Sequence, residues 1–90
     1  MEHNTFVQHF DGTMYELADA IGNLRYDALN KFLVLLSNKI RDDANADKGR
    51  NRDKLSKVLK QAHEALDVTS LYISAAWIIS KPYMEGVKEK

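Results

Sequence analysis

His63 is one of the few side chains in this sequence suited to chemistry at neutral pH, because imidazole gains and loses a proton close to that range. Glu64 follows it directly, and Asp67 stands one helical turn further on. Two interpretations are open. His63 either accepts a phosphoryl group, or lies at the edge of an apolar core with Asp67 as its partner.

The segment DDANADKGRNRDK, residues 42–54, carries oxygen atoms at a spacing typical of calcium loops. The alternating ligands would be Asp43, Asn45 and Asp47. An EF-hand loop counted from the first of these needs a glycine at its sixth position and a glutamate at its twelfth. This chain has Lys48 and Lys54 there, which place positive charge around the ion. We therefore expect no metal site and interpret residues 44–52 as the loop between two helices.

A cluster of positive charge begins in the same segment. Its members are Lys48, Arg50, Arg52, Lys54, Lys57 and Lys60. Asp53 is the one acidic residue within the same stretch, 48–60. Such a cluster can bind phosphates through direct charge and counterion release. It lacks the interleaved aromatic residues on which bases stack, and the chain as a whole is neutral, with 13 basic and 13 acidic residues. Nucleic acid or another polyanion is thus an alternative partner, not the expected one.

Other catalytic patterns are missing from the sequence. The absence of cysteine excludes disulfides, thiolate zinc sites and a cysteine nucleophile. The chain also lacks the Glu-x-x-His pairs of di-iron bundles and the glycine patterns that bind nucleotide phosphates. We therefore expect no enzymatic activity and no cofactor.

Length and composition predict one small folded domain. The chain has 90 residues, of which 44% are apolar and 29% charged. Its N-terminus lacks the basic start and apolar run of a signal peptide. The longest dense apolar stretch, residues 71–79, is shorter than the roughly 20 residues needed to span a bilayer. We expect a cytoplasmic protein that does not enter a membrane.

The apolar residues recur at steps of three and four, and no comparable stretch alternates with period two. This pattern predicts an all-α chain. Thr13 and Glu16 form a capping box, which favours a helix start at this point, and Pro82 favours a helix end before it. The expected elements are a short helical segment over 5–12, a helix over about 14–43, a helix over about 54–80, and a frayed tail over 81–90. The sequence leaves open whether the helix over 14–43 is bent or broken at 22–23.

Two long helices joined by a short loop predict an antiparallel hairpin. Residues 32–36 and 71–79 are apolar nearly all the way round, so each of these segments needs cover on more than one side. We expect two hairpins to pack as a homodimeric four-helix bundle; a compact three-helix monomer is the alternative. The expected interface consists of Leu71, Tyr72, Ala75, Ala76, Trp77 and Ile78, with Phe32, Leu33 and Leu36 opposite.

HEALDVTSL, residues 63–71, resembles the phospho-accepting box of sensor histidine kinases, which pairs a histidine with an acid on a dimeric four-helix bundle. The shared features are His63, Glu64 and the expected dimeric hairpin. The kinase box continues with a basic residue and a proline, and it lies on the first helix of its hairpin. Here residues 65–68 have neither residue, and His63 lies on the second helix. Histidine phosphotransfer is accordingly the less favoured alternative to a function in protein association, as an adaptor, assembly factor or regulator.

Overall fold

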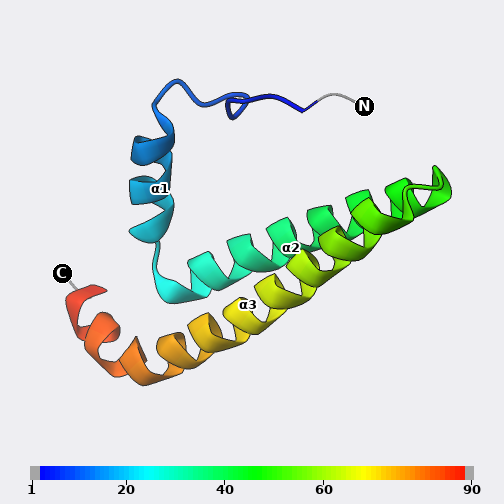
Figure 1. Ribbon diagram of the computed structural model, residues 1–90. Helices are drawn as coiled ribbons and strands as arrows, with labels where there is room; N and C mark the ends of the chain where they lie inside the picture. Colours follow the sequence, from blue (N-terminus) through cyan, green and yellow to red (C-terminus); the bar gives the residue numbers. More distant parts are fainter. Residues whose placement is uncertain (1–2, 89–90) are drawn as a thin grey trace.

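The computed structural model is helical in the part of the chain that it describes, residues 3–88. Helix α1 spans Met14–Gly22, α2 spans Tyr26–Gly49 and α3 spans Asp53–Lys88, and no strand occurs among these residues. The prediction of an all-α chain is therefore confirmed. Figure 1 shows that α2 and α3 lie side by side, joined by a short turn, while α1 stands away from both.

Helix α1 begins at the predicted capping box. The hydroxyl of Thr13 accepts a hydrogen bond from the backbone N–H of Glu16 at 3.1 Å, and the Glu16 carboxylate accepts one from the backbone N–H of Thr13 at 2.6 Å. These bonds satisfy amides that have no partner inside the helix. The helical segment predicted over residues 5–12 is not present, because this stretch is irregular and His9 adopts a left-handed backbone conformation with φ of 68°.

The helix predicted over residues 14–43 is broken. The break follows residue 22, at the position where the sequence allowed either a bend or a break. The backbone N–H of Asn23 donates to the carbonyl of Asp19 and closes α1. Arg25 then takes an extended conformation, with φ of −57° and ψ of 147°, before α2 starts. A continuous apolar stripe fits two consecutive helices as well as one, so the stripe alone could not decide the matter.

The turn between α2 and α3 is shorter than predicted. Residues 44–52 were expected to be a loop, yet α2 continues to Gly49, and the turn occupies residues 50–52. The chain reverses through Asn51, whose φ of 63° is left-handed, a conformation that asparagine tolerates better than most residues. The backbone N–H of Arg52 donates to the carbonyl of Asp47 at 2.9 Å and fixes the reversal.

Helix α3 passes through Pro82, so the predicted end near residue 80 is wrong. Proline cannot donate a hydrogen bond to the carbonyl of Ile78, and its ring crowds that carbonyl, which bends a helix without always ending it. Figure 1 shows the last turns of α3 bending away from the line of the helix. The tail predicted to fray over 81–90 is helical as far as Lys88, and residues 89–90 lie outside the described residues.

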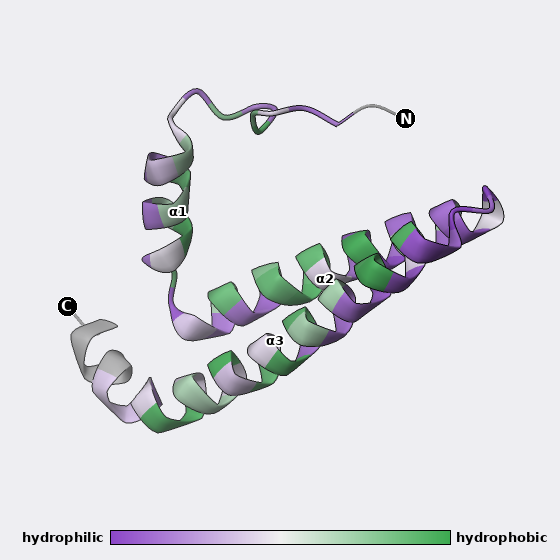
Figure 2. Ribbon diagram, viewed as in Figure 1, coloured by the Kyte–Doolittle hydropathy of each residue, from purple (hydrophilic) through white to green (hydrophobic). Residues whose placement is uncertain are grey.

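The fully buried residues of α2 and α3 are mostly small. Ala44 is the one buried apolar residue among those described. The buried polar residues are Ser37, Asp47, Ser56 and Ser70. The Ser56 hydroxyl donates to the carbonyl of Ala44 at 2.7 Å, which ties the two helices together near the turn. Figure 2 shows a hydrophilic end at the turn, whereas apolar residues follow α2 and the C-terminal half of α3.

Candidate functional site

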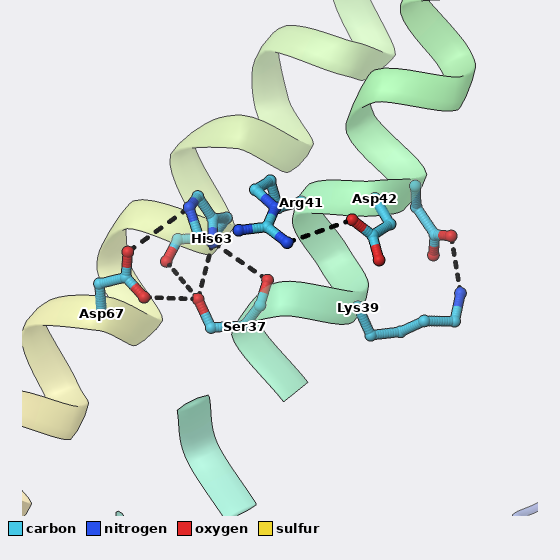
Figure 3. A network of polar contacts seen from close by, with 7 residues as sticks. Ser37, Lys39, Arg41, Asp42, His63 and Asp67 are labelled. Carbon is cyan, nitrogen blue, oxygen red and sulfur yellow. Dashed lines mark hydrogen bonds and ion pairs between the residues drawn. The ribbon is translucent and has the colours of Figure 1, made fainter. Parts of the chain in front are cut away.

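A network of polar side chains joins α2 to α3 midway along their contact (Figure 3). Ser37 of α2 meets two residues of α3, His63 and Asp67. The Ser37 hydroxyl lies 2.7 Å from Nδ1 of His63 and 2.6 Å from Oδ1 of Asp67. Nδ1 of His63 is also 3.0 Å from the carbonyl oxygen of Ser37, and Nε2 lies 3.4 Å from Oδ2 of Asp67. The predicted partnership of His63 with Asp67 is thereby confirmed.

Counting hydrogens assigns the direction of these bonds. The hydroxyl of Ser37 has one hydrogen, and its shortest contact is to the acceptor Oδ1 of Asp67. The hydroxyl oxygen then accepts from Nδ1–H of His63, which is shared with the carbonyl of Ser37. This tautomer is inferred from the partners, since hydrogen positions follow from the network. The hydroxyl and the carbonyl oxygen of Ser37 both contact α3 and hold α2 against it.

Serine, histidine and aspartate are also the residues of a hydrolytic triad, but this arrangement differs from one. In a triad the serine hydroxyl gives its hydrogen to the histidine, and the aspartate holds the opposite ring nitrogen. Here the hydroxyl contacts Asp67 directly, and Ser37 is 0% exposed, so a substrate cannot reach its oxygen. The chemistry of the network is that of a buried connection between helices.

The same contacts bear on phosphotransfer at His63. A histidine that accepts a phosphoryl group needs a ring nitrogen with a free lone pair and access for the donor. Both nitrogens of His63 already face oxygen partners, and its side chain is 16% exposed. With Nδ1–H shared between the two oxygens of Ser37, Nε2 is the nitrogen that keeps a lone pair, and it lies beside the carboxylate of Asp67, whose negative charge opposes the approach of an anionic phosphoryl donor.

Ser37 was not among the residues that the sequence indicated. It lies 26 positions before His63, and its neighbours Leu36 and Ile40 belong to an apolar stripe. The one signal was a polar residue at a position in that stripe where an apolar one was expected. Such a residue in a helix contact usually has a hydrogen-bond partner on the other helix.

At the turn, the predicted cationic cluster is divided into two groups. Arg50 and Arg52 pair with the carboxylate of Asp47, at 3.3 and 3.5 Å. Asp47 is 7% exposed, so these two arginines compensate a buried charge. The lysines do not share this role. A hollow of about 290 Å³ is lined by Asn45, Lys48, Asp53, Ser56, Lys57 and Lys60.

The residues of the calcium-like spacing lie in α2, not in a loop. Asp43 pairs with Lys39 one turn earlier, at 2.6 Å, and Asp47 is held by the arginines of the turn. Among residues 3–88, no three histidine or carboxylate side chains converge as metal ligands. None of the helices described here combines the length and the apolar character needed to cross a membrane.

The predicted interface residues do not share one surface. Those that are half-buried toward their own chain are Phe32, Leu33, Ala76 and Trp77. Those that are exposed are Leu36, Leu71, Tyr72, Ala75 and Ile78. Because successive residues of a helix point about 100° apart, the six predicted residues within 71–78 cannot all lie on one side of the helix. The exposed members are the ones free to meet another molecule.

Trp77 contributes to the junction of α1 and α2 with α3. The guanidinium of Arg25 lies 5.0 Å from the centre of the Trp77 ring, within the range of a cation–π contact. The same guanidinium donates two hydrogen bonds of 2.7 Å to Asp27. These bonds lower the pKa of Asp27 below its ordinary value. The bridge is therefore complete above the usual range of aspartate titration, and is lost when the pH falls through the lowered pKa.

Comparisons with known proteins give no relative. No family model, no curated protein and no solved structure matches the chain.

Proposed function

We propose that this chain is a small non-enzymatic association module that works as a homodimer, in which two α2–α3 pairs pack as a four-helix bundle. The observation that supports this proposal most directly is the large surface of the single chain. It exposes 7316 Å², whereas a compact protein of 10.3 kDa exposes about 5,400 Å². Its radius of gyration is 16.2 Å, compared with about 12 Å for a compact domain of this length.

The excess area is large enough to form a stable interface. It amounts to about 1,900 Å² for each chain relative to a compact monomer. If each copy buried only half of this excess, the interface would cover about 1,900 Å², at the upper end of the standard size for specific complexes. A second copy could therefore supply the cover that the single chain lacks.

The exposed side chains have the chemistry that such an interface requires. Large apolar residues on both long helices are open to solvent in the single chain. They include Leu36 on α2 and, on α3, Leu55, Val58, Val68, Leu71, Tyr72, Ile78, Ile79 and Tyr83. Apolar surface of this extent on a soluble protein usually marks an interaction site. In the proposal, the dimer acts in the cytoplasm, and its remaining surface serves an unidentified protein partner, as an adaptor, assembly or regulatory factor.

The mass of the protein in solution tests the proposal. Light scattering at micromolar concentration is expected to give a mass near twice the 10.3 kDa of the chain. Sedimentation equilibrium over a range of dilutions should then show the dimer dissociating to the monomer. A monomer mass throughout would rule the proposal out.

A second candidate function is the binding of a polyanion by the lysines near the turn. Lys48, Lys57 and Lys60 line one hollow, and no ion pair involves them among the described residues. Lysine ammonium groups free of intrachain partners can bind phosphate groups directly. Arg50 and Arg52 contribute less in this proposal, since both already compensate Asp47.

Matched double variants separate this binding from a general effect of charge. Lys57→Ala/Lys60→Ala is expected to weaken binding to a short DNA duplex and to reduce the salt slope by about 1.8, or 0.9 for each lost contact. Lys31→Ala/Lys39→Ala removes the same charge from the other long helix and should weaken binding less. Fluorescence anisotropy at several salt concentrations measures both. Equal losses in the two variants, or no binding at low salt, would contradict the second candidate.

A further inference from the structure

The C-terminal half of α3 presents an apolar face that points away from α2. Its members, hereafter the α3 apolar face, are Val68, Leu71, Tyr72, Ala75, Ile78, Ile79 and Tyr83. They recur at steps of three and four, so they lie along one side of the helix. Each of these side chains is exposed. The four central large ones are about equally open to solvent, at 69% for Leu71 and Ile78, 73% for Tyr72 and 71% for Ile79.

The opposite side of the same turns is the side that meets the rest of the chain. Ser70 is buried, and Ser74 and Trp77 are half-buried. Tyr72 is two residues from each serine, which places it on the far side of the helix from both. The α3 apolar face is therefore separate from the side of α3 that contacts the rest of the chain.

The outer side of α2 differs in character. Lys31, Lys39 and Asp42 are exposed there, and Leu35 is the one large exposed apolar residue that shares their side of the helix. Its exposed neighbours Val34 and Leu36 point about 100° to either side. Isolated apolar residues are ordinary on protein surfaces, whereas a continuous row is not. Of the two long helices, α3 is thus the one with an outer surface built for a helical partner.

We infer that the occupant of the α3 apolar face is the same face of a second copy, with the two α3 helices antiparallel about a two-fold axis near Ala75. This inference rests on the proposed homodimer and refines its arrangement: the two α3 helices meet at the centre, and the α2 helix of each copy lies outside them, in place of a core shared equally by all four helices. Ala75 lies midway along the face between Val68 and Tyr83, and its small side chain allows two helices to approach at the axis. A two-fold axis places Leu71 of one copy beside Ile79 of the other, and the reverse.

Charge on α3 selects the antiparallel arrangement. Lys54, Lys57 and Lys60 are exposed in the first turns of the helix, and no charged residue interrupts the α3 apolar face. A parallel pair would place each of these lysines beside its own copy, and such like-charge pairs oppose association. An antiparallel pair that overlaps from Val68 to Tyr83 leaves the lysines of both copies outside the contact, at opposite ends of the dimer.

A pair of matched double variants tests the inference. Tyr72→Glu/Ile79→Glu introduces two charges into the face and is expected to give a monomer mass by light scattering, with helical circular dichroism retained. Tyr15→Glu/Leu35→Glu changes the same kinds of residue at exposed positions on α1 and α2. It should remain dimeric. A dimer that survives in the face variant overturns the inference but leaves the proposed homodimer standing, whereas a monomeric unaltered protein removes both.

Disulfide trapping gives a second measurement that holds even if the charged variant fails to fold. The natural chain has no cysteine, so any disulfide between two protein chains must join introduced thiols. In oxidised glutathione, Ala75→Cys is expected to form a covalent dimer, because a two-fold axis at this position brings the two Cα atoms within bonding range. A mixture of Leu71→Cys with Ile79→Cys should cross-link several-fold more than either variant alone. Stronger cross-linking of each variant with itself would show a parallel pair, and cross-linking of Leu35→Cys alone would place the contact on α2; both results contradict the inference.

Discussion

Replacing Ser37 by leucine is expected to destabilise the α2–α3 contact by at least about 3 kcal/mol, from overpacking together with loss of the polar network. Ser37 has no exposed surface, so a larger side chain at this position must displace its neighbours. Leucine would force the two helices apart. It would also leave His63 and Asp67 without the hydroxyl that connects them. Urea unfolding followed by circular dichroism measures the loss.

Two further variants separate size from polarity at this position. Ser37→Ala keeps the close approach and removes the hydroxyl, so a loss of about 1–2 kcal/mol is expected. Lys39→Leu places the same leucine side chain on the exposed side of α2 and should change stability by less than about 0.5 kcal/mol. If Ser37→Leu were no more destabilising than Lys39→Leu, the close contact of α2 with α3 at this point would be refuted.

The features that the sequence predicted correctly are local ones. The capping box at Thr13 and Glu16 and the pair of His63 with Asp67 each span one turn of a single helix. The all-α class follows from a period repeated along the whole chain. In each case the relevant residues are neighbours in sequence, so their spacing alone determines whether they can meet.

The features that the sequence did not predict depend on another part of the chain or on a small energy difference. Ser37 acquires its role from residues on a different helix, and sequence spacing carries no sign of that meeting. Helix α2 continues to Gly49 although this places the negative charge of Asp47 near its C-terminus, where the helix dipole disfavours it. The two arginines of the turn offset this charge. Helix α3 continues through Pro82 because a proline can bend a helix as well as end it, and the sequence does not show which of the two occurs.

The α3 apolar face shows a similar limit. The sequence indicated a segment that is apolar all round, and it predicted an interface that included both Tyr72 and Trp77. The structure assigns Trp77 to the chain itself, against Arg25, and leaves Tyr72 and Ile79 outward. Which side of such a segment is already covered depends on the register of α2 against α3, which is set by small buried residues such as Ala44 and Ser56.

Thermal unfolding of the protein is expected to depend on its concentration. A chain with one buried apolar residue among those described has little stability of its own, so most of its apolar burial must come from the second copy. Tenfold dilution lowers the free energy of unfolding of a dimer to two chains by about 1.4 kcal/mol. For an assembly of this size the midpoint should therefore fall by about 3–6 °C with each tenfold dilution.

The charged face variant provides the control for this result. Tyr72→Glu/Ile79→Glu should unfold at a lower temperature than the unaltered protein, and its midpoint should not change with dilution, because a monomer unfolds by a first-order reaction. Tyr15→Glu/Leu35→Glu should keep the concentration dependence. A sharp transition of the unaltered protein at one temperature across a hundredfold range of concentration would mean that the single chain is stable alone. In that case the apolar surface along α3 would remain in contact with water in a stable monomer, contrary to the expectation that a surface of this size binds another molecule.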